Sequence, residues 1–132
     1  MTIDPQLFIF GGSLIAILVL AGIARWMKLG GDPALRDEDA VRVAAIEVDD
    51  GFVADGVSIG RGGRGAVCMD AAGRIMVIKL HGNRFAGRIL NSRAAAREEV
   101  DGLVIDTGEA RFGQVRLSLD DSSTWADRIN RL

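Results

Sequence analysis

The stretch IMVIKLHGNRFAGRIL, residues 75–90, decides the fold of this chain. Gly82 and Asn83 separate two β-rich runs and are typical of a two-residue hairpin turn. With these two residues as the loop, His81 lies opposite Arg84, and successive side chains alternate between the faces of the hairpin. One face then carries Met76, Ile78, Leu80, Phe85 and Ile89, and the other carries Lys79, His81, Arg84 and Arg88, with Val77 and Ala86 between them. The stretch predicts an antiparallel hairpin with one apolar and one basic face.

Short β-rich runs punctuated by glycine extend outward from this hairpin. They predict strands at 53–59, 65–69, 75–81, 84–90, 103–106 and 112–119, and a turn at 70–73. Residues 91–99 are interpreted as a connector with one helical turn at 94–96. A meandering antiparallel sheet is therefore expected.

Helical patterns flank the strands. Residues 35–48 place apolar side chains on one stripe, and three acidic residues favour the start of that helix. Near the carboxyl end, Thr124 and Asp127 approximate a capping box, and Trp125, Ile129 and Leu132 share one face that should pack on the sheet. The fold class is thus α+β, with a small soluble domain at 34–132. Its architecture resembles a pleckstrin-homology-type domain, although six strands are one fewer than that fold has.

A more local resemblance lies between Gly65 and Leu90, above all in HGNRFAGRIL at 81–90. This segment resembles one found in small uncharacterised bacterial single-pass membrane proteins. The resemblance implies a class of protein and no activity.

The amino-terminal region is a continuous apolar run. Leu7 to Ala24 read LFIFGGSLIAILVLAGIA, without a charge, and as a helix these residues extend ~27 Å, close to the apolar thickness of a bilayer. Residues 1–29 are interpreted as a transmembrane anchor and 30–33 as a linker. The alternative is a secretory signal peptide, with small residues near Ala24 resembling a cleavage site. Because the start MTIDPQ lacks Lys and Arg, we favour the anchor.

Charges after the run predict its orientation. Arg25 and Lys28 should remain on the cytoplasmic side, with Trp26 as an interfacial anchor. We expect an inner-membrane protein whose amino terminus lies outside and whose domain is cytoplasmic. Within the run, Gly12 and Ala16 have the small-xxx-small spacing that lets another membrane helix approach closely.

The charge distribution is uneven although the net charge is only −2. Residues 56–97 hold eight basic residues and one acid, and the flanks on both sides are acidic. The basic face of the hairpin could bind anionic lipid headgroups or an acidic protein partner. Alternatively, its cations pair with the acidic flanks of the same domain.

The residues that most often carry catalysis have no supporting context in this chain. Residues 60–65, GRGGRG, match G-x-G-x-x-G, but a strand follows instead of the helix that binds a dinucleotide phosphate. Cys68 is interpreted as a buried strand residue, and His81 is the only histidine. The expectation is a protein without enzymatic activity, cofactor, metal or nucleic-acid ligand.

Two functions remain open at this point. The first is a single-pass accessory or scaffold subunit that docks on a larger membrane complex, such as a respiratory or photosynthetic assembly. The second is a membrane-proximal module that binds anionic headgroups or an acidic partner through the basic face. An enzyme is the least favoured class.

Overall fold

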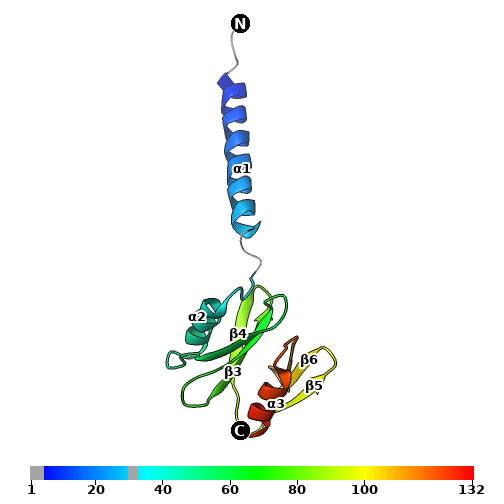
Figure 1. The fold of residues 1–132 in the computed structure, drawn as a ribbon. Helices are drawn as coiled ribbons and strands as arrows, with labels where there is room; N and C mark the ends of the chain where they lie inside the picture. The colour runs from blue at the N-terminus through cyan, green and yellow to red at the C-terminus, as the bar shows by residue number, and fades with distance from the viewer. Residues whose placement is uncertain (1–4, 30–32) are drawn as a thin grey trace. The chain divides into compact units, whose positions relative to one another are not determined.

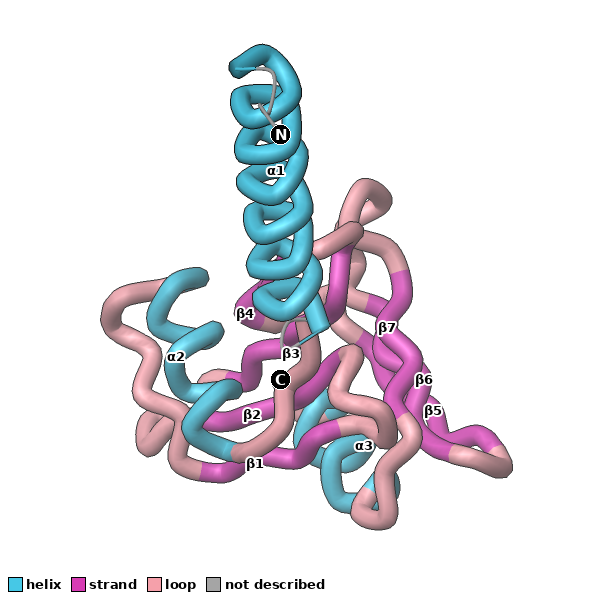
Figure 2. Tube along the Cα trace, turned by 90° about the horizontal axis from the view of Figure 1, so that it is seen from above, coloured by secondary structure: helices cyan, strands magenta, loops and turns pink. Residues whose placement is uncertain are grey.

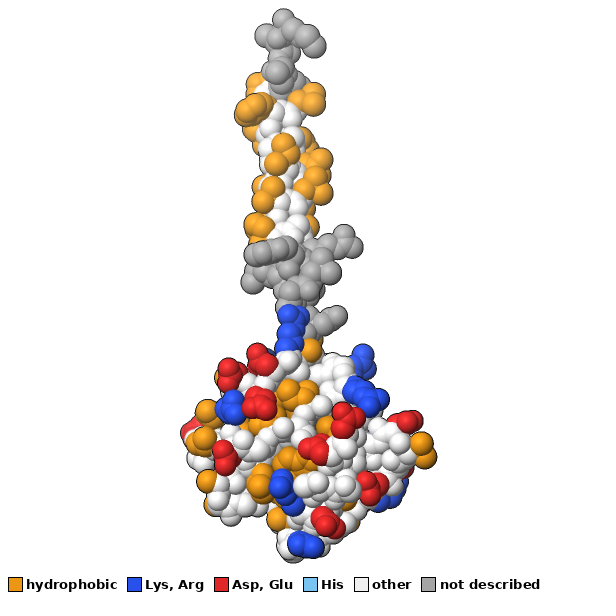
Figure 3. Space-filling view, viewed as in Figure 1, with side chains coloured by type: hydrophobic (Ala, Val, Ile, Leu, Met, Phe, Trp, Pro, Cys, Tyr) orange, Lys and Arg blue, Asp and Glu red, His pale blue; other side chains and the backbone are white. Residues whose placement is uncertain are grey.

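The computed structural model describes residues 5–29 and 33–132, except for the side chains of residues 25–29. It divides into two compact units, residues 1–32 and 33–132. The first unit contains one helix, α1 (Pro5–Leu29). Its residues up to Ala24 are exposed, and Figure 3 shows apolar side chains all along this part.

The second unit contains seven strands and two helices, which confirms the predicted α+β class (Figure 1). The first sheet is formed by β1 (Gly56–Ile59), β2 (Gly65–Met69), β3 (Ile75–His81) and β4 (Arg84–Ile89) in that order. The second is formed by β5 (Ala95–Glu99), β6 (Gly102–Asp106) and β7 (Gln114–Leu117). All neighbouring strands are antiparallel. Two helices, α2 (Glu38–Val48) and α3 (Ser122–Asn130), complete the domain.

Both faces of the first sheet are covered. On one face, α2 packs through Val41, Ala44 and Ala45 against strand residues such as Met76 and Ile78. On the other face, the second sheet and α3 enclose a larger core that includes Val67, Val77, Leu103, Ile105, Trp125 and Ile129. Figure 2 shows the two sheets as separate layers. The sequence predicted a single meandering antiparallel sheet, so the presence of a second sheet is a correction that changes the environment of the basic face.

The hairpin register is confirmed in full. His81 pairs with Arg84, Leu80 with Phe85 and Val77 with Arg88. The turns at Gly82–Asn83 and at residues 70–73 also lie where they were predicted.

The connector predicted at 91–99 is confirmed only for residues 91–94, and the helical turn predicted at 94–96 is wrong, because residues 95–99 form β5. An alanine-rich segment favours helix by local propensity, but here tertiary pairing decides. The strand pairs with β6 on one side. On the other side of β5, the side chain of Asn130 in α3 bonds to the backbone of Ala96. Its Oδ1 accepts a hydrogen bond from the Ala96 amide at 2.9 Å, and its Nδ2 donates one to the Ala96 carbonyl at 2.9 Å. With β5 the domain has seven strands, in one sheet of four and one of three.

The predicted helix starts are also wrong. The first helix begins at Glu38, not at residue 35, because Asp37 caps it by accepting a hydrogen bond from Ala40. Leu35 is buried outside the helix, where its amide donates to the Gly63 carbonyl.

The last helix begins at Ser122, so Thr124 lies inside it and no capping box forms there. Its N-cap residue is Asp121, whose carboxylate accepts hydrogen bonds from Ser58 and from the Trp125 indole instead of capping the helix. Trp125 and Ile129 pack on the sheets as expected, but Leu132 lies beyond the helix and is exposed.

Candidate binding surfaces

The described part of α1 has the length and composition of a membrane span. Pro5–Ala24 has a mean hydropathy of 2.6, and a signal sequence has the same properties. Gly12 and Ala16 are exposed on this helix, and no atom within 4 Å would obstruct a side chain at Gly12. The side chains of the predicted interface anchors Arg25, Trp26 and Lys28 lie outside the described residues.

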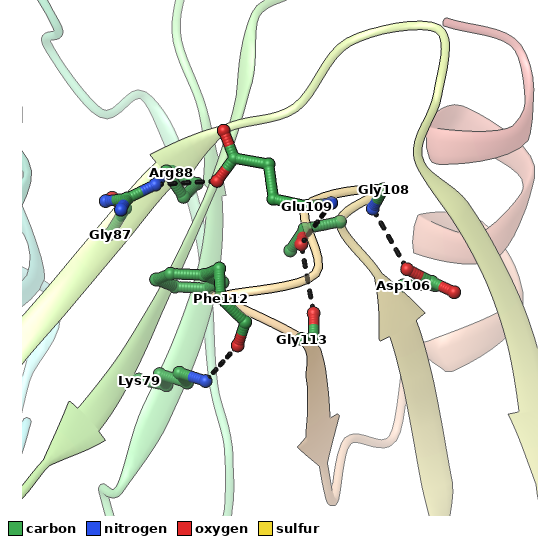
Figure 4. A network of polar contacts seen from close by, with 9 residues as sticks. Lys79, Gly87, Arg88, Asp106, Gly108, Glu109, Phe112 and Gly113 are labelled. Carbon is green, nitrogen blue, oxygen red and sulfur yellow. Dashed lines mark hydrogen bonds and ion pairs between the residues drawn. The ribbon is translucent and has the colours of Figure 1, made fainter.

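The predicted basic face is divided between two environments. Lys79, which is half-buried, and Arg88, which stays exposed, both contact the loop between β6 and β7. His81 and Arg84 are exposed at the end of the hairpin. Lys79 and Arg88 hold the ring of Phe112 between them, with the Lys79 ammonium 4.4 Å and the Arg88 guanidinium 4.9 Å from its centroid (Figure 4). Phe112 is itself buried, so its ring fills the space between these two cations of the basic face.

Polar contacts fix the same loop. Arg88 Nε donates to Glu109 Oε2 at 2.8 Å, and Lys79 Nζ donates to the Phe112 carbonyl. The Thr107 hydroxyl donates to the Gly113 carbonyl at 2.9 Å and accepts from the Glu109 amide. Arg88 is thus paired with Glu109 of the acidic segment that follows the basic region. For this residue, the alternative of pairing within the domain is confirmed.

The exposed half of the basic face borders a shallow groove. Arg84, Asn83 and Phe85 line it together with Ala44, Glu47 and Val48 of α2, around a volume of about 500 Å³. Within the described residues, neither His81 nor Arg84 has a polar side-chain partner. Because Glu47 also lines the groove, the groove carries both a positive and a negative side chain.

A second cleft was not foreseen from the sequence. Arg64, Gly65, Lys79, Gln114 and Arg116 line it, with Leu80 and Val115, around about 190 Å³. It lies where β7 of the second sheet reaches the ends of β2 and β3. Pairing within hairpins can be read from a sequence, but the approach of one sheet to another cannot, so no sequence signal pointed to this cleft.

The first helix of the domain has an apolar outer surface as well as an apolar inner one. Val43 is 59% exposed and Ile46 is 45% exposed, although both belong to a helix whose opposite side is in the core. Residues three apart on a helix are neighbours, so these two form one patch. Acidic residues flank the patch along the chain, with Asp39 before it and Glu47 after it.

Two side chains outside the grooves described above, Cys68 and Asp70, have shifted pKa values. Burial, helped by the nearby Asp70 charge, raises the pKa of the Cys68 thiol to about 12, so the thiol stays protonated near neutral pH and is a poor nucleophile. This confirms Cys68 as a buried strand residue. Burial tends to raise the pKa of Asp70, but hydrogen bonds from Arg74, together with its charge, outweigh that effect and lower it.

The Gly60–Gly65 tract connects β1 to β2, as predicted, and no helix follows it. Gly63 has a positive φ of 67°, and a Cβ there would lie 2.7 Å from the Leu35 carbonyl oxygen. The glycine is thus required by packing, and the tract forms no phosphate loop of the dinucleotide type. Among the described residues, no group of three or more His, Cys, Asp or Glu side chains is placed to hold a metal ion.

Comparison with known proteins adds no family: no protein-family model, no curated protein and no solved structure matches this chain.

Proposed function

We propose that this chain is a single-pass, non-enzymatic accessory subunit that is anchored by α1 and docks its domain on a larger membrane complex. The observation that carries the proposal is the exposed apolar patch of Val43 and Ile46 on a helix that already supplies the core with its other side. A contiguous exposed apolar patch, as opposed to a single exposed apolar side chain, is typical of a surface that another protein covers.

The rest of the domain supports a binding role. Its only cysteine is buried with a raised pKa, and its only histidine is exposed at a hairpin end. The resemblance of Gly65–Leu90 to bacterial single-pass proteins gives the same class and adds no chemistry. The spacing of Gly12 and Ala16 would let α1 pack against a helix of the same complex.

The test is extraction of the full chain from its native membrane in mild detergent, followed by sizing. We expect the unmodified protein to elute in a large complex and Ile46→Gln to shift it toward the size of the free protein. Val100→Gln is the matched control, because Val100 is fully exposed on the β5–β6 turn. A lone monomer for the unmodified protein would contradict docking, and an unchanged complex with Ile46→Gln would exclude this helix as the docking surface.

The orientation is part of the same proposal. Arg25 and Lys28 follow the apolar run, so the domain should lie in the cytoplasm of a bacterial cell, at the inner membrane. Fusions at the carboxyl terminus should be active with a cytoplasmic reporter and silent with a periplasmic one. The opposite result would overturn the orientation and favour a signal sequence.

Binding of lipid headgroups by the whole basic face is less well supported. Arg88 is paired with Glu109, and Lys79 is half-buried against Phe112, so only His81 and Arg84 of this face are exposed without a polar side-chain partner among the described residues. A Lys or Arg near an anionic surface contributes about 1 kcal/mol, so Arg84 alone gives weak attraction.

A further inference from the structure

We propose that the cleft between β7 and the ends of β2 and β3 binds a phosphate-type oxyanion. This site is separate from the patch of Val43 and Ile46 and does not depend on the docking proposal. Its lining includes Arg64, Lys79 and Arg116 as cations, and no carboxylate.

The first argument is the state of the cations. Arg64 is exposed and has no polar side-chain partner among the described residues. Lys79 is half-buried, and its contacts are the carbonyl and the ring of Phe112, neither of which carries a negative charge. An ammonium has three donor hydrogens, so Lys79 keeps donors for a further acceptor.

The third cation is only partly neutralised. Arg116 Nη1 lies 3.0 Å from Glu99, but the same carboxylate also pairs with Arg97 at 3.4 Å. One negative charge thus serves two guanidinium groups, of which only that of Arg116 belongs to the lining of the cleft. Elsewhere in the domain, arginines such as Arg42 and Arg74 have carboxylate partners of their own.

The second argument is how the fold builds the cleft. Gly65 pairs with Lys79, which sets the end of β2 beside the end of β3. A Cβ at Gly65 would lie 2.7 Å from Leu117 Cδ2, so the missing side chain is what lets β7 approach this corner. That approach brings Arg116 and Gln114 to the same opening as Arg64.

The chemistry of the ligand follows from the donors. A phosphate or phosphomonoester offers three terminal oxygens and close to two negative charges, which matches cations supplied by three different strands and loops. A carboxylate offers only two oxygens. The volume of about 190 Å³ has room for roughly six waters at about 30 Å³ each, and so for such a group with part of its hydration.

The experiment is an NMR titration of the full chain in neutral detergent, following the backbone amides of Gly65, Lys79 and Gln114. One arm adds inorganic phosphate, and the other adds phosphatidic acid to the micelles. We expect saturable shifts of these amides in at least one arm. Shifts with phosphatidic acid but not with phosphate identify a lipid headgroup as the source, and shifts with phosphate identify a soluble phosphate.

Two variants and a control make the test specific. Arg64→Gln removes a cation that has no polar side-chain partner among the described residues, and Gln114→Glu adds a carboxylate at an exposed position of the lining. Each should weaken binding by roughly fivefold or more, the factor that one contact between unit charges corresponds to in bulk water. Arg131→Gln removes an arginine that does not line the cleft and should leave binding unchanged.

Three results would overturn the proposal. These are shifts that stay linear without saturation, an equal response in Gln114→Glu, or no shift in either arm.

Discussion

The packing of Phe112 between two cations gives the sharpest test of how the two sheets are held together. We consider Phe112→Leu, which keeps most of the buried apolar volume but removes the aromatic ring. The ring has a half-buried ammonium 4.4 Å from its centroid and a guanidinium at 4.9 Å. A cation–π contact contributes about 0.5–1 kcal/mol when exposed and about 2 kcal/mol when desolvated. With about 1 kcal/mol for the first contact and about 0.5 for the second, plus imperfect repacking, the loss should be about 2 kcal/mol.

A double-mutant cycle separates the ring from the rest of the site. Lys79→Met removes the cation, and the carbonyl of residue 112 remains present in both backgrounds, so the coupling free energy reports the ring contact. Urea unfolding of the full chain in detergent, followed by fluorescence, measures each free energy of unfolding. A Trp26→Phe background leaves the buried Trp125 as the only tryptophan.

The expected coupling free energy is about 1 kcal/mol. A coupling below about 0.5 kcal/mol is within the ordinary error of additivity and would refute the reasoning. In that case the contact between the Lys79 ammonium and the Phe112 ring would add nothing measurable to the stability of the fold.

Three further predictions concern single residues. Gly102→Ala should destabilise the domain by about 3 kcal/mol in urea unfolding, because its Cβ would lie 2.0 Å from a β7 carbonyl oxygen, whereas Gly56→Ala, with open space, should change little. Asp70→Asn should be less stable than the unmodified protein at pH 7. The pKa of the Asp70 carboxyl is lower in the folded protein than its value of about 3.9 in the unfolded chain, so its charge stabilises the fold fully at a pH above about 3.9. The free energies of unfolding of Asp70→Asn and of the unmodified protein should therefore converge as the pH falls through the folded pKa. Cys68, with its pKa raised to about 12, should resist maleimide at pH 8 in the native state and react fully in urea, as mass spectrometry would detect.

Local sequence signals were reliable where neighbours in the chain are also neighbours in space. The hairpin from Ile75 to Ile89 follows from a two-residue turn and the alternation of side chains, and its register is confirmed pair by pair. The apolar run of α1 could also be recognised from a local signal, because its length and composition alone are enough for a helix that can cross a membrane. Burial of Cys68 followed from its place in a short apolar strand.

Local signals failed where a distant segment supplies the partner. β5 has the composition of a helical turn, and only β6 and Asn130 make it a strand. At the start of α3 the Asp121 carboxylate bonds to Ser58, which is far away in the sequence, and makes no capping hydrogen bond to the helix. The sequence also could not show that the two halves of the basic face have different surroundings.

The amino-acid sequence by itself determined the apolar helix, the α+β class and the alternation of apolar and basic side chains on the central hairpin. These follow from helix length and from the period of two along a strand, which need no knowledge of the rest of the chain. Only the tertiary structure decided that the ring of Phe112 lies between Lys79 and Arg88, and that Arg64 and Arg116 line the same cleft. The physical reason is that the second sheet packs across the first by burying apolar side chains, and burial is non-directional, so the strand pattern alone does not say which charges that packing brings together.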